Sequence, residues 1–223
     1  MIPLRDENPT RTFPFVTIAI IVSNVIVFGY EVLLPPELLE NLLRRYAIIP
    51  YNLVHFSIST QPSGFPNIFT LISSTFLHGG IWHIVGNMLF LWIFGNNVED
   101  ALGHFKFIFF YFISASVAGL SQSFTSPDSY IPVIGASGAV AGVLGAYFVL
   151  YPHARVVTLF WLFIFIRIVK VPALVFLALW FFLQVMYAGM GGGIAWFAHI
   201  GGFIAGILMI LPAWLRRKHF LHL

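Results

Sequence analysis

The sequence predicts an all-α, polytopic membrane protein in which six transmembrane helices form one bundle. Apolar residues make up 59% of its 223 residues and charged residues only 9%, whereas soluble domains carry about 25% charged residues. Apolar runs that approach the ~20 residues of a membrane-spanning helix recur six times. Lys and Arg lie at the edges of these runs rather than in one patch, so the net charge of +3 does not indicate nucleic-acid binding. We therefore expect a single membrane domain over residues 1–223.

The predicted spans are about 13–34, 82–98, 105–124, 136–151, 171–188 and 195–214. A long first loop, residues 35–81, contains PELLENLLRRYAIIP, whose apolar residues recur at helical spacing and predict a short interfacial helix. Residues 156–171 are apolar enough to suggest a seventh span. Arg155, Arg167 and Lys170 hem in that segment, which favours a hairpin or an interfacial excursion.

The basic residues predict the orientation of the bundle, because Lys and Arg favour the cytoplasmic side. They precede span one, flank the turns after spans two and four, and follow span six, whereas residues 125–135 and 189–194 contain none. Both termini are therefore expected to be cytoplasmic. Arg44 and Arg45, in the long first loop, are the basic residues that this orientation does not place on the cytoplasmic side. Without a transit peptide or a large extra domain in view, we expect the inner membrane of a prokaryotic cell.

Several polar residues are expected at a similar depth in the membrane, near its outer side. His83 and Asn87 share a helix face at the start of span two, Ser137 opens span four, and His199 lies near the start of span six. Polar residues inside a membrane are costly and usually face an interior or a wet cavity. Span four is only about 21 Å long, shorter than the ~30 Å hydrocarbon core. We therefore expect a water-accessible pit above Ser137, lined by the irregular backbone that leads into it.

Small residues predict that spans four and six pack closely. Gly138 and Gly142 lie on one face of span four, and Gly202 and Gly206 form a similar strip on span six. Such faces let helix backbones approach one another. Close packing of these two helices would bring Ser137 near His199.

This pair has the chemistry of a serine hydrolase. A serine hydroxyl becomes a nucleophile when a base takes its proton, and a histidine can take and return that proton near neutral pH. The backbone N–H of Ser137 at a helix start is an expected oxyanion donor, and His83 and Asn87 are candidate side-chain donors. No acidic residue falls in the pattern to orient His199, so we expect a Ser–His dyad rather than a triad.

Three motifs resemble those of the rhomboid family of intramembrane serine proteases, and the similarity covers residues from about 67 to 210. They are GASG at 135–138, like the family's GxSG; AHIGG at 198–202 with Gly206, like AHxGGxxxG; and His78, His83 and Asn87, like HxxxxHxxxN.

The resemblance implies that Ser137 is the nucleophile, His199 the base, and His83 and Asn87 the oxyanion partners. It implies a structural role for His78 in fastening the first loop. The implied substrates are transmembrane segments of other membrane proteins, met within the lipid bilayer, with no cofactor, metal or nucleic acid involved.

Two features depart from the family pattern. Some members place a Tyr four residues after the nucleophile, against the catalytic imidazole; here that residue is Ala141, so something else must position His199. The Trp-Arg pair often found in the first loop is also missing.

The main alternative function is that of a catalytically inactive rhomboid relative that binds membrane clients. A transporter and a zinc site at His78, His83 and His199 are weaker alternatives, because no internal repeat and no supporting carboxylate are evident.

Overall fold

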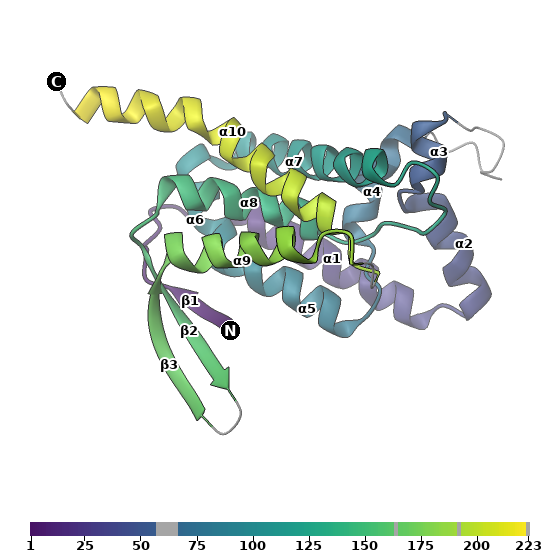
Figure 1. Ribbon diagram of the computed structural model, residues 1–223, viewed down its shortest axis with the longest axis horizontal. Helices are drawn as coiled ribbons and strands as arrows, with labels where there is room; N and C mark the ends of the chain where they lie inside the picture. Colours follow the sequence, from purple (N-terminus) through teal and green to yellow (C-terminus); the bar gives the residue numbers. More distant parts are fainter. Residues whose placement is uncertain (57–66, 163–164, 191–192, 222–223) are drawn as a thin grey trace.

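Helices form most of the molecule, and a small sheet lies at one end of the bundle (Figure 1). The computed structural model describes residues 1–56, 67–162, 165–190 and 193–221. A helix occupies each of the six predicted ranges. These helices are α1 (Phe15–Leu33), α5 to α6 (Ile81–Phe90 and Asn96–Leu102, joined by a π-helical segment, Leu91–Gly95), α7 (His104–Thr125), α8 (Ser137–Leu150), α9 (Ala173–Tyr187) and α10 (Trp196–Leu221). The first loop adds α2 (Pro36–Tyr46), α3 (Pro50–Val54), α4 (Thr70–Ser73) and 3-10 turns at Asn67–Phe69 and Ser74–Phe76.

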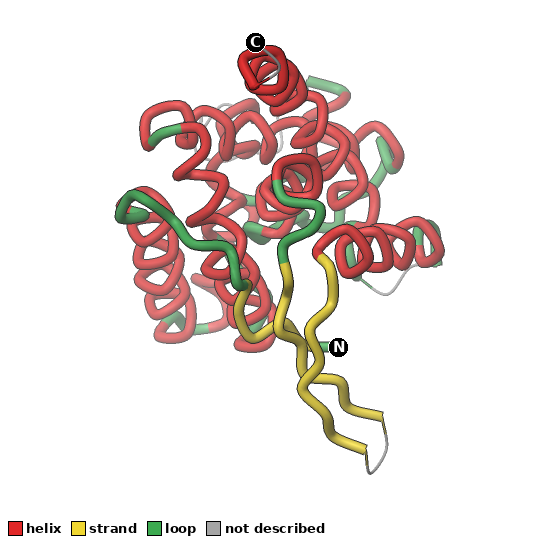
Figure 2. The backbone as a smooth tube through the Cα atoms, turned by 90° about the vertical axis from the view of Figure 1, so that its left-hand side faces the viewer, coloured by secondary structure: helices red, strands yellow, loops and turns green. Residues whose placement is uncertain are grey.

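The all-α class is wrong in one respect, because three strands form an antiparallel sheet in the order β1-β2-β3. Strands β2 (Arg155–Leu162) and β3 (Phe165–Pro172) make a hairpin, and β1 (Ile2–Asp6) pairs with the other edge of β2. The hairpin segment is rich in β-branched and aromatic residues, which suit a pleated sheet. The structure confirms a hairpin between spans four and five, and Figure 2 shows it extending away from the helices.

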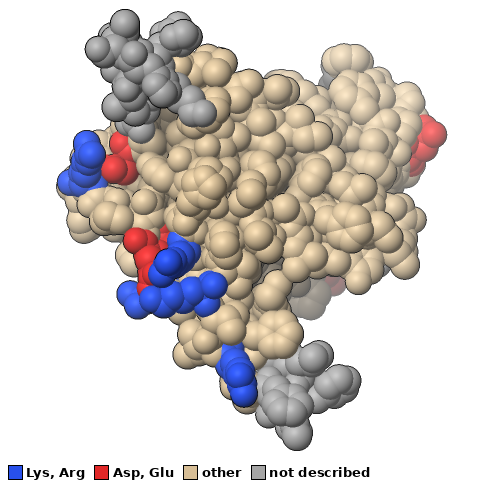
Figure 3. Space-filling model, turned by 60° about the vertical axis from the view of Figure 1, so that its left-hand side comes forward, with Lys and Arg blue, Asp and Glu red and all other residues tan. Residues whose placement is uncertain are grey.

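Helix length alone supports fewer crossings than the six predicted. Among the residues that the structure describes, two helices, α1 and α7, are long and apolar enough to span a membrane. A third span is added if the segments Asn67–Phe76 and Ile81–Leu102, bent by 88° at their junction, are one broken span. Helices α8 and α9 have only 14 and 15 residues. The six-span count therefore stays a prediction, while the surface in Figure 3 has a broad uncharged middle, as an apolar membrane belt requires.

Helix α8 lies at the centre of the bundle, where every residue from Gly138 to Tyr147 is buried. Its deep end packs against large aromatic side chains, with the ring of Phe94 5.0 Å from that of Tyr147. The Tyr147 hydroxyl donates to Asp6 Oδ2 at 2.6 Å, which ties strand β1 to the end of α8 remote from Ser137. The central helix is thus held along its length, with only its first residue, Ser137, and its last three residues, 148–150, left partly exposed.

Glycines allow α8 and α10 to touch backbone to backbone. A Cβ added at Gly202 would overlap the carbonyl oxygen of Gly138, and one added at Gly206 would overlap that of Gly142. A Cβ at Gly142 would in turn overlap Ser114 of α7. A side chain at Gly202 or Gly206 would push α10 away from α8, and a side chain at Gly142 would push α8 away from α7.

A buried carboxylate fastens the opposite end of the bundle. Glu99 is fully buried, and its two oxygens accept hydrogen bonds from the backbone N–H groups of Val16 and Thr17 at 2.9 and 2.7 Å. These are N–H groups of the first turn of α1, which have no partner within their own helix. Glu99 therefore acts as a cap supplied from α6, which fixes α1 against the second predicted span.

Candidate active site

A glycine turn places Ser137 at the first position of α8. Gly135 has a φ of +117°, a conformation that favours glycine, and its N–H donates to the Ser74 carbonyl at 2.9 Å. A Cβ at Gly135 would lie 2.6 Å from His83 Nε2, so the imidazole of His83 packs directly on this residue. Glycine is therefore required at position 135 for two reasons: the backbone angle favours it, and any side chain would collide with His83.

The loop that leads to Ser137 is paired with the first loop. Val133 and Ile48 exchange backbone hydrogen bonds of 2.8 and 3.1 Å. This pairing gives partners to the irregular backbone that precedes α8, as buried backbone requires. It also holds the entry to Ser137 in one position relative to the rest of the bundle.

A small cavity of about 20 Å³ lies beside Ser137, which is room for about one water molecule. Its walls are made mostly of small side chains and backbone. They include Ala115, Ala118, Gly119, Ala195 and Ala198, with Ser74 and Thr75 at the polar side. The cavity occupies part of the place where the sequence predicts a pit.

The first turn of α10 brings His199 to the same end of the bundle. The carbonyl oxygen of Ala198 lies 3.8 Å from the position a Cβ of Gly138 would take. Ala198 precedes His199 and Gly138 follows Ser137, so the backbones of the two candidate residues are neighbours. The imidazole Nδ1 of His199 lies 2.8 Å from Gln184 Oε1 of α9.

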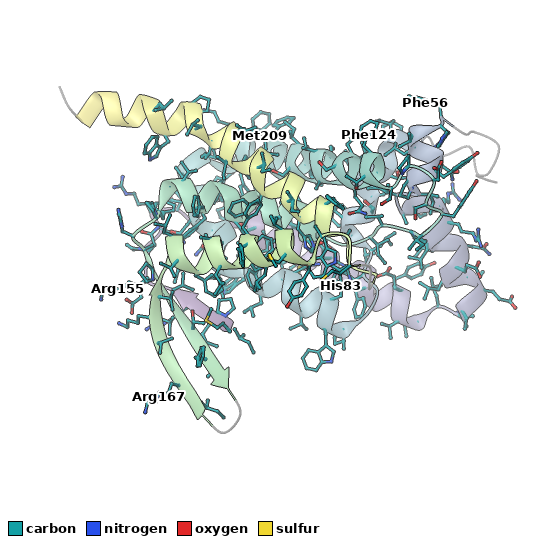
Figure 4. The ribbon with its side chains drawn as sticks, in the orientation of Figure 1. Phe56, His83, Phe124, Arg155, Arg167 and Met209 are labelled. Carbon is teal, nitrogen blue, oxygen red and sulfur yellow. The ribbon has the colours of Figure 1, made fainter. Side chains whose placement is uncertain are left out.

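His83 approaches the same place from α5, and Figure 4 shows it at the end of the bundle where α10 begins. Its Nδ1 accepts the N–H of Gly79 at 3.4 Å. The proton of the neutral ring is therefore on Nε2, the nitrogen that faces Gly135.

Asn87 is held by His78. Its Nδ2 lies 3.1 Å from His78 Nε2, and His78 Nδ1 lies 3.3 Å from the Phe76 carbonyl, which accepts the ring proton. The N–H of His78 donates to the Glu31 carboxylate of α1 at 3.2 Å. His78 thus links the end of the first loop to α1 and α5, and it takes one of the two amide protons of Asn87.

A family model for the rhomboid domain matches residues 66–216 of the chain. The chain belongs to the rhomboid family. Within the part of this rhomboid that the structure describes, no group of three His, Cys, Asp or Glu side chains is arranged to hold a metal ion.

Named relatives of this rhomboid include proteases and mitochondrial proteins. The chain is 32% identical over 199 residues to Rhomboid protein 1, mitochondrial, of Saccharomyces cerevisiae, covering 85% of the chain and 51% of that protein. It is 32% identical over 149 residues to the Presenilin-associated rhomboid-like protein, mitochondrial, of Mus musculus (63% and 37%). It is 28% identical over 161 residues to Rhomboid-like protease 3 of Toxoplasma gondii (67% and 56%). The chain thus spans about half the length, or less, of these relatives.

Membrane localisation follows from this membership and from the apolar helices. The narrower prediction of a prokaryotic inner membrane does not fit the two relatives named as mitochondrial. That prediction relied on the lack of a transit peptide in this sequence, whereas the relatives extend well beyond the matched region.

Sequence analysis missed the contact of Gln184 in this rhomboid. Ala141, at the position of the family's stacking Tyr, is fully buried, and a Cβ at Gly202 of α10 would lie 3.3 Å from its Cβ. The partner of His199 comes instead from α9. Gln184 is the one amide or charged side chain in that 15-residue apolar helix, and this isolated polar residue is the signal that could have indicated it.

Proposed function

We propose that this rhomboid is a serine endopeptidase that hydrolyses peptide bonds in or near transmembrane segments of membrane proteins. Ser137 is the nucleophile and His199 the general base. The contact between Ala198 and Gly138 carries the proposal, because it makes neighbours of the two helix starts that hold these residues. The motif match and the relatives named as proteases support the same reaction class.

The first step forms an acyl-enzyme. His199 takes the proton of Ser137 Oγ as that oxygen attacks the substrate carbonyl carbon, and it then gives the proton to the leaving amine as the C–N bond breaks. Water then hydrolyses the ester by the same steps. His199 takes a proton from water as the water oxygen attacks the ester carbon, and it returns the proton to Ser137 Oγ as the acid product leaves.

Three groups close to Ser137 are the proposed donors to the oxyanion. The N–H of Ser137 lies in the first turn of α8, where it has no partner within the helix and the positive end of the helix dipole adds to it. His83 Nε2–H packs on Gly135, two residues before Ser137. The Asn87 amide keeps one proton that His78 does not take. Preorganised donors of this kind stabilise the charge that develops in the transition state.

The dimensions of the cavity predict a preference for small residues. We assign it to the substrate side chain on the amino side of the scissile bond, since it adjoins Ser137 and most of its lining residues are alanine, glycine, serine or threonine. Each methylene that does not fit costs about 10–200-fold in kcat/KM. In a substrate series with Ala, Val, Leu or Phe at this position, kcat/KM is expected to fall in that order. Equal cleavage of the Ala and Phe substrates would contradict the assignment.

Covalent labelling tests the proposed nucleophile. A fluorophosphonate probe is expected to modify Ser137, because a bond from Oγ to phosphorus forms as fluoride leaves and the proton passes to His199. Intact-mass and peptide mass spectrometry locate the adduct on the purified wild type and on Ser137→Ala. Labelling at another residue would overturn the nucleophile. An unlabelled protein that still binds membrane clients would favour the inactive client-binding alternative.

A further inference from the structure

Gln184 makes two hydrogen bonds that together fix the orientation of its amide. The side chain is 7% exposed, and its Nε2 donates to the Trp180 carbonyl, one turn earlier on α9, at 3.0 Å. A carbonyl oxygen can only accept, so the NH₂ group must be on this side. Oε1 is then the atom that faces His199, 2.8 Å from Nδ1.

This orientation determines which nitrogen of His199 carries the proton. Because Oε1 is an acceptor only, Nδ1 of the imidazole must donate. In the neutral ring Nε2 is therefore unprotonated, and its lone pair points to the side of the ring away from Gln184. A general base requires this tautomer, because the lone pair must be free to take the hydroxyl proton.

Aromatic rings enclose the imidazole on other sides. The ring of Trp180 is centred 6.0 Å from that of His199, and the ring of Trp196 is 6.2 Å away at 87°. They limit rotation of the imidazole but offer its Nδ1 no acceptor, since an indole nitrogen only donates. Gln184 is the acceptor that the structure gives to Nδ1.

We propose that Gln184 is the positioning residue of the dyad, which holds His199 in the Nδ1–H tautomer with Nε2 available to Ser137. This inference rests on the proposed proteolytic function. In soluble serine proteases a buried carboxylate has this task and also stabilises the charged imidazolium. A neutral amide fixes the tautomer without adding charge, so this site orients its base while leaving it less basic than a triad would.

The tautomer is measured directly by ¹⁵N NMR of the histidine side chains, in a Ser137→Ala background that prevents self-cleavage. His199 is assigned by comparison with a Ser137→Ala, His199→Ala protein. We expect protonated Nδ1 and unprotonated Nε2, and a mixture of tautomers in Gln184→Leu. A His199 ring protonated at Nε2 in the Ser137→Ala protein that keeps Gln184 would overturn the proposal. Since this measurement needs no turnover, its result is independent of whether the protein cleaves anything.

Kinetics give the second test. Gln184→Leu is expected to lower kcat by about 10²–10⁴-fold, the contribution of a correctly placed general base, while KM changes little. In a triad, the wrong tautomer costs about 10⁴-fold. Met186→Leu, at an exposed position of the same helix, is the matched control and is expected to keep wild-type kcat. Wild-type kcat in a folded Gln184→Leu protein would overturn the proposal.

Gln184→Glu separates positioning from a merely structural role. A carboxylate oxygen accepts the same hydrogen bond from Nδ1, while the bond to the Trp180 carbonyl is lost. The carboxylate also adds a negative charge, which favours the protonated imidazole. His83, the other histidine of the proposed catalytic machinery, stays unchanged in this variant. We expect retained activity with the acidic limb of the kcat/KM–pH profile moved up by about 1–3 units, because the base must lose its proton at a higher pH. An inactive but folded Gln184→Glu protein, or a limb at the wild-type pH, would contradict the assignment.

Discussion

Ser137→Ala and His199→Ala are each expected to reduce kcat by about 10⁶-fold, the loss seen when a soluble serine protease loses either residue. Without the hydroxyl no acyl-enzyme forms, and without the imidazole the hydroxyl keeps its proton. The double variant should be no slower than either single variant, because the two residues act as one unit. Single-turnover cleavage of a transmembrane substrate in liposomes, with excess enzyme, measures all three.

Matched controls have the same residue types but lie outside the candidate site, one in α7 and one in the turn after α8. Ser116→Ala removes a hydroxyl that bonds only its own helix, at the Phe112 carbonyl, and should leave kcat unchanged. His153→Ala removes an exposed imidazole between α8 and β2 and should also be silent. If Ser137→Ala cleaves at a substantial rate and contaminating proteases are excluded, the nucleophile is not Ser137. Loss of wild-type activity in EDTA, restored by zinc, would point to a metal mechanism instead.

The positions of the main helices were predictable because each is a continuous apolar run with polar or small residues at its ends. The predicted span 105–124 matches α7 (His104–Thr125), and 136–151 matches α8 (Ser137–Leu150). The hairpin was partly predictable, because its Arg and Lys residues opposed a seventh span. Strand β1 was not predicted: five residues, IPLRD, carry no periodic signal, and their pairing with β2 joins segments about 150 residues apart.

The site shows a similar division. Motif spacing made Ser137, His199, His83 and Asn87 candidates, because each was expected near the start of a helix and at a similar depth. The role of Gln184 depends on which way one side chain turns between α9 and α10, and no periodicity records this. A single polar residue in an apolar helix is also what ordinary interhelical hydrogen bonding produces. Only the distances to Trp180 and His199 together give the amide its direction.

The packing of α8 on α10 leads to the second large effect, a loss of stability in Gly206→Ala. The added methyl would meet the oxygen, carbonyl carbon and Cα of Gly142, all of them backbone atoms of the central helix. A flexible side chain could turn aside, whereas a helix backbone moves only if the two helices separate. Overpacking a core usually costs about 1–3 kcal/mol, and we expect this variant to lie at or above the upper end.

Gly29→Ala is the control, because a Cβ there meets nothing within 4 Å and the residue lies inside helix α1. Alanine is favoured over glycine in a helix by roughly 0.5–1 kcal/mol, so this variant should unfold at the wild-type temperature or above it. Thermal unfolding of both proteins in one detergent gives the comparison. Gly206→Ala should also cleave more slowly while still folded, since separating α8 from α10 moves His199 away from Ser137. A Gly206→Ala protein as stable and as active as Gly29→Ala would mean that these backbones are not in contact, and the geometry proposed for the dyad would fail with them.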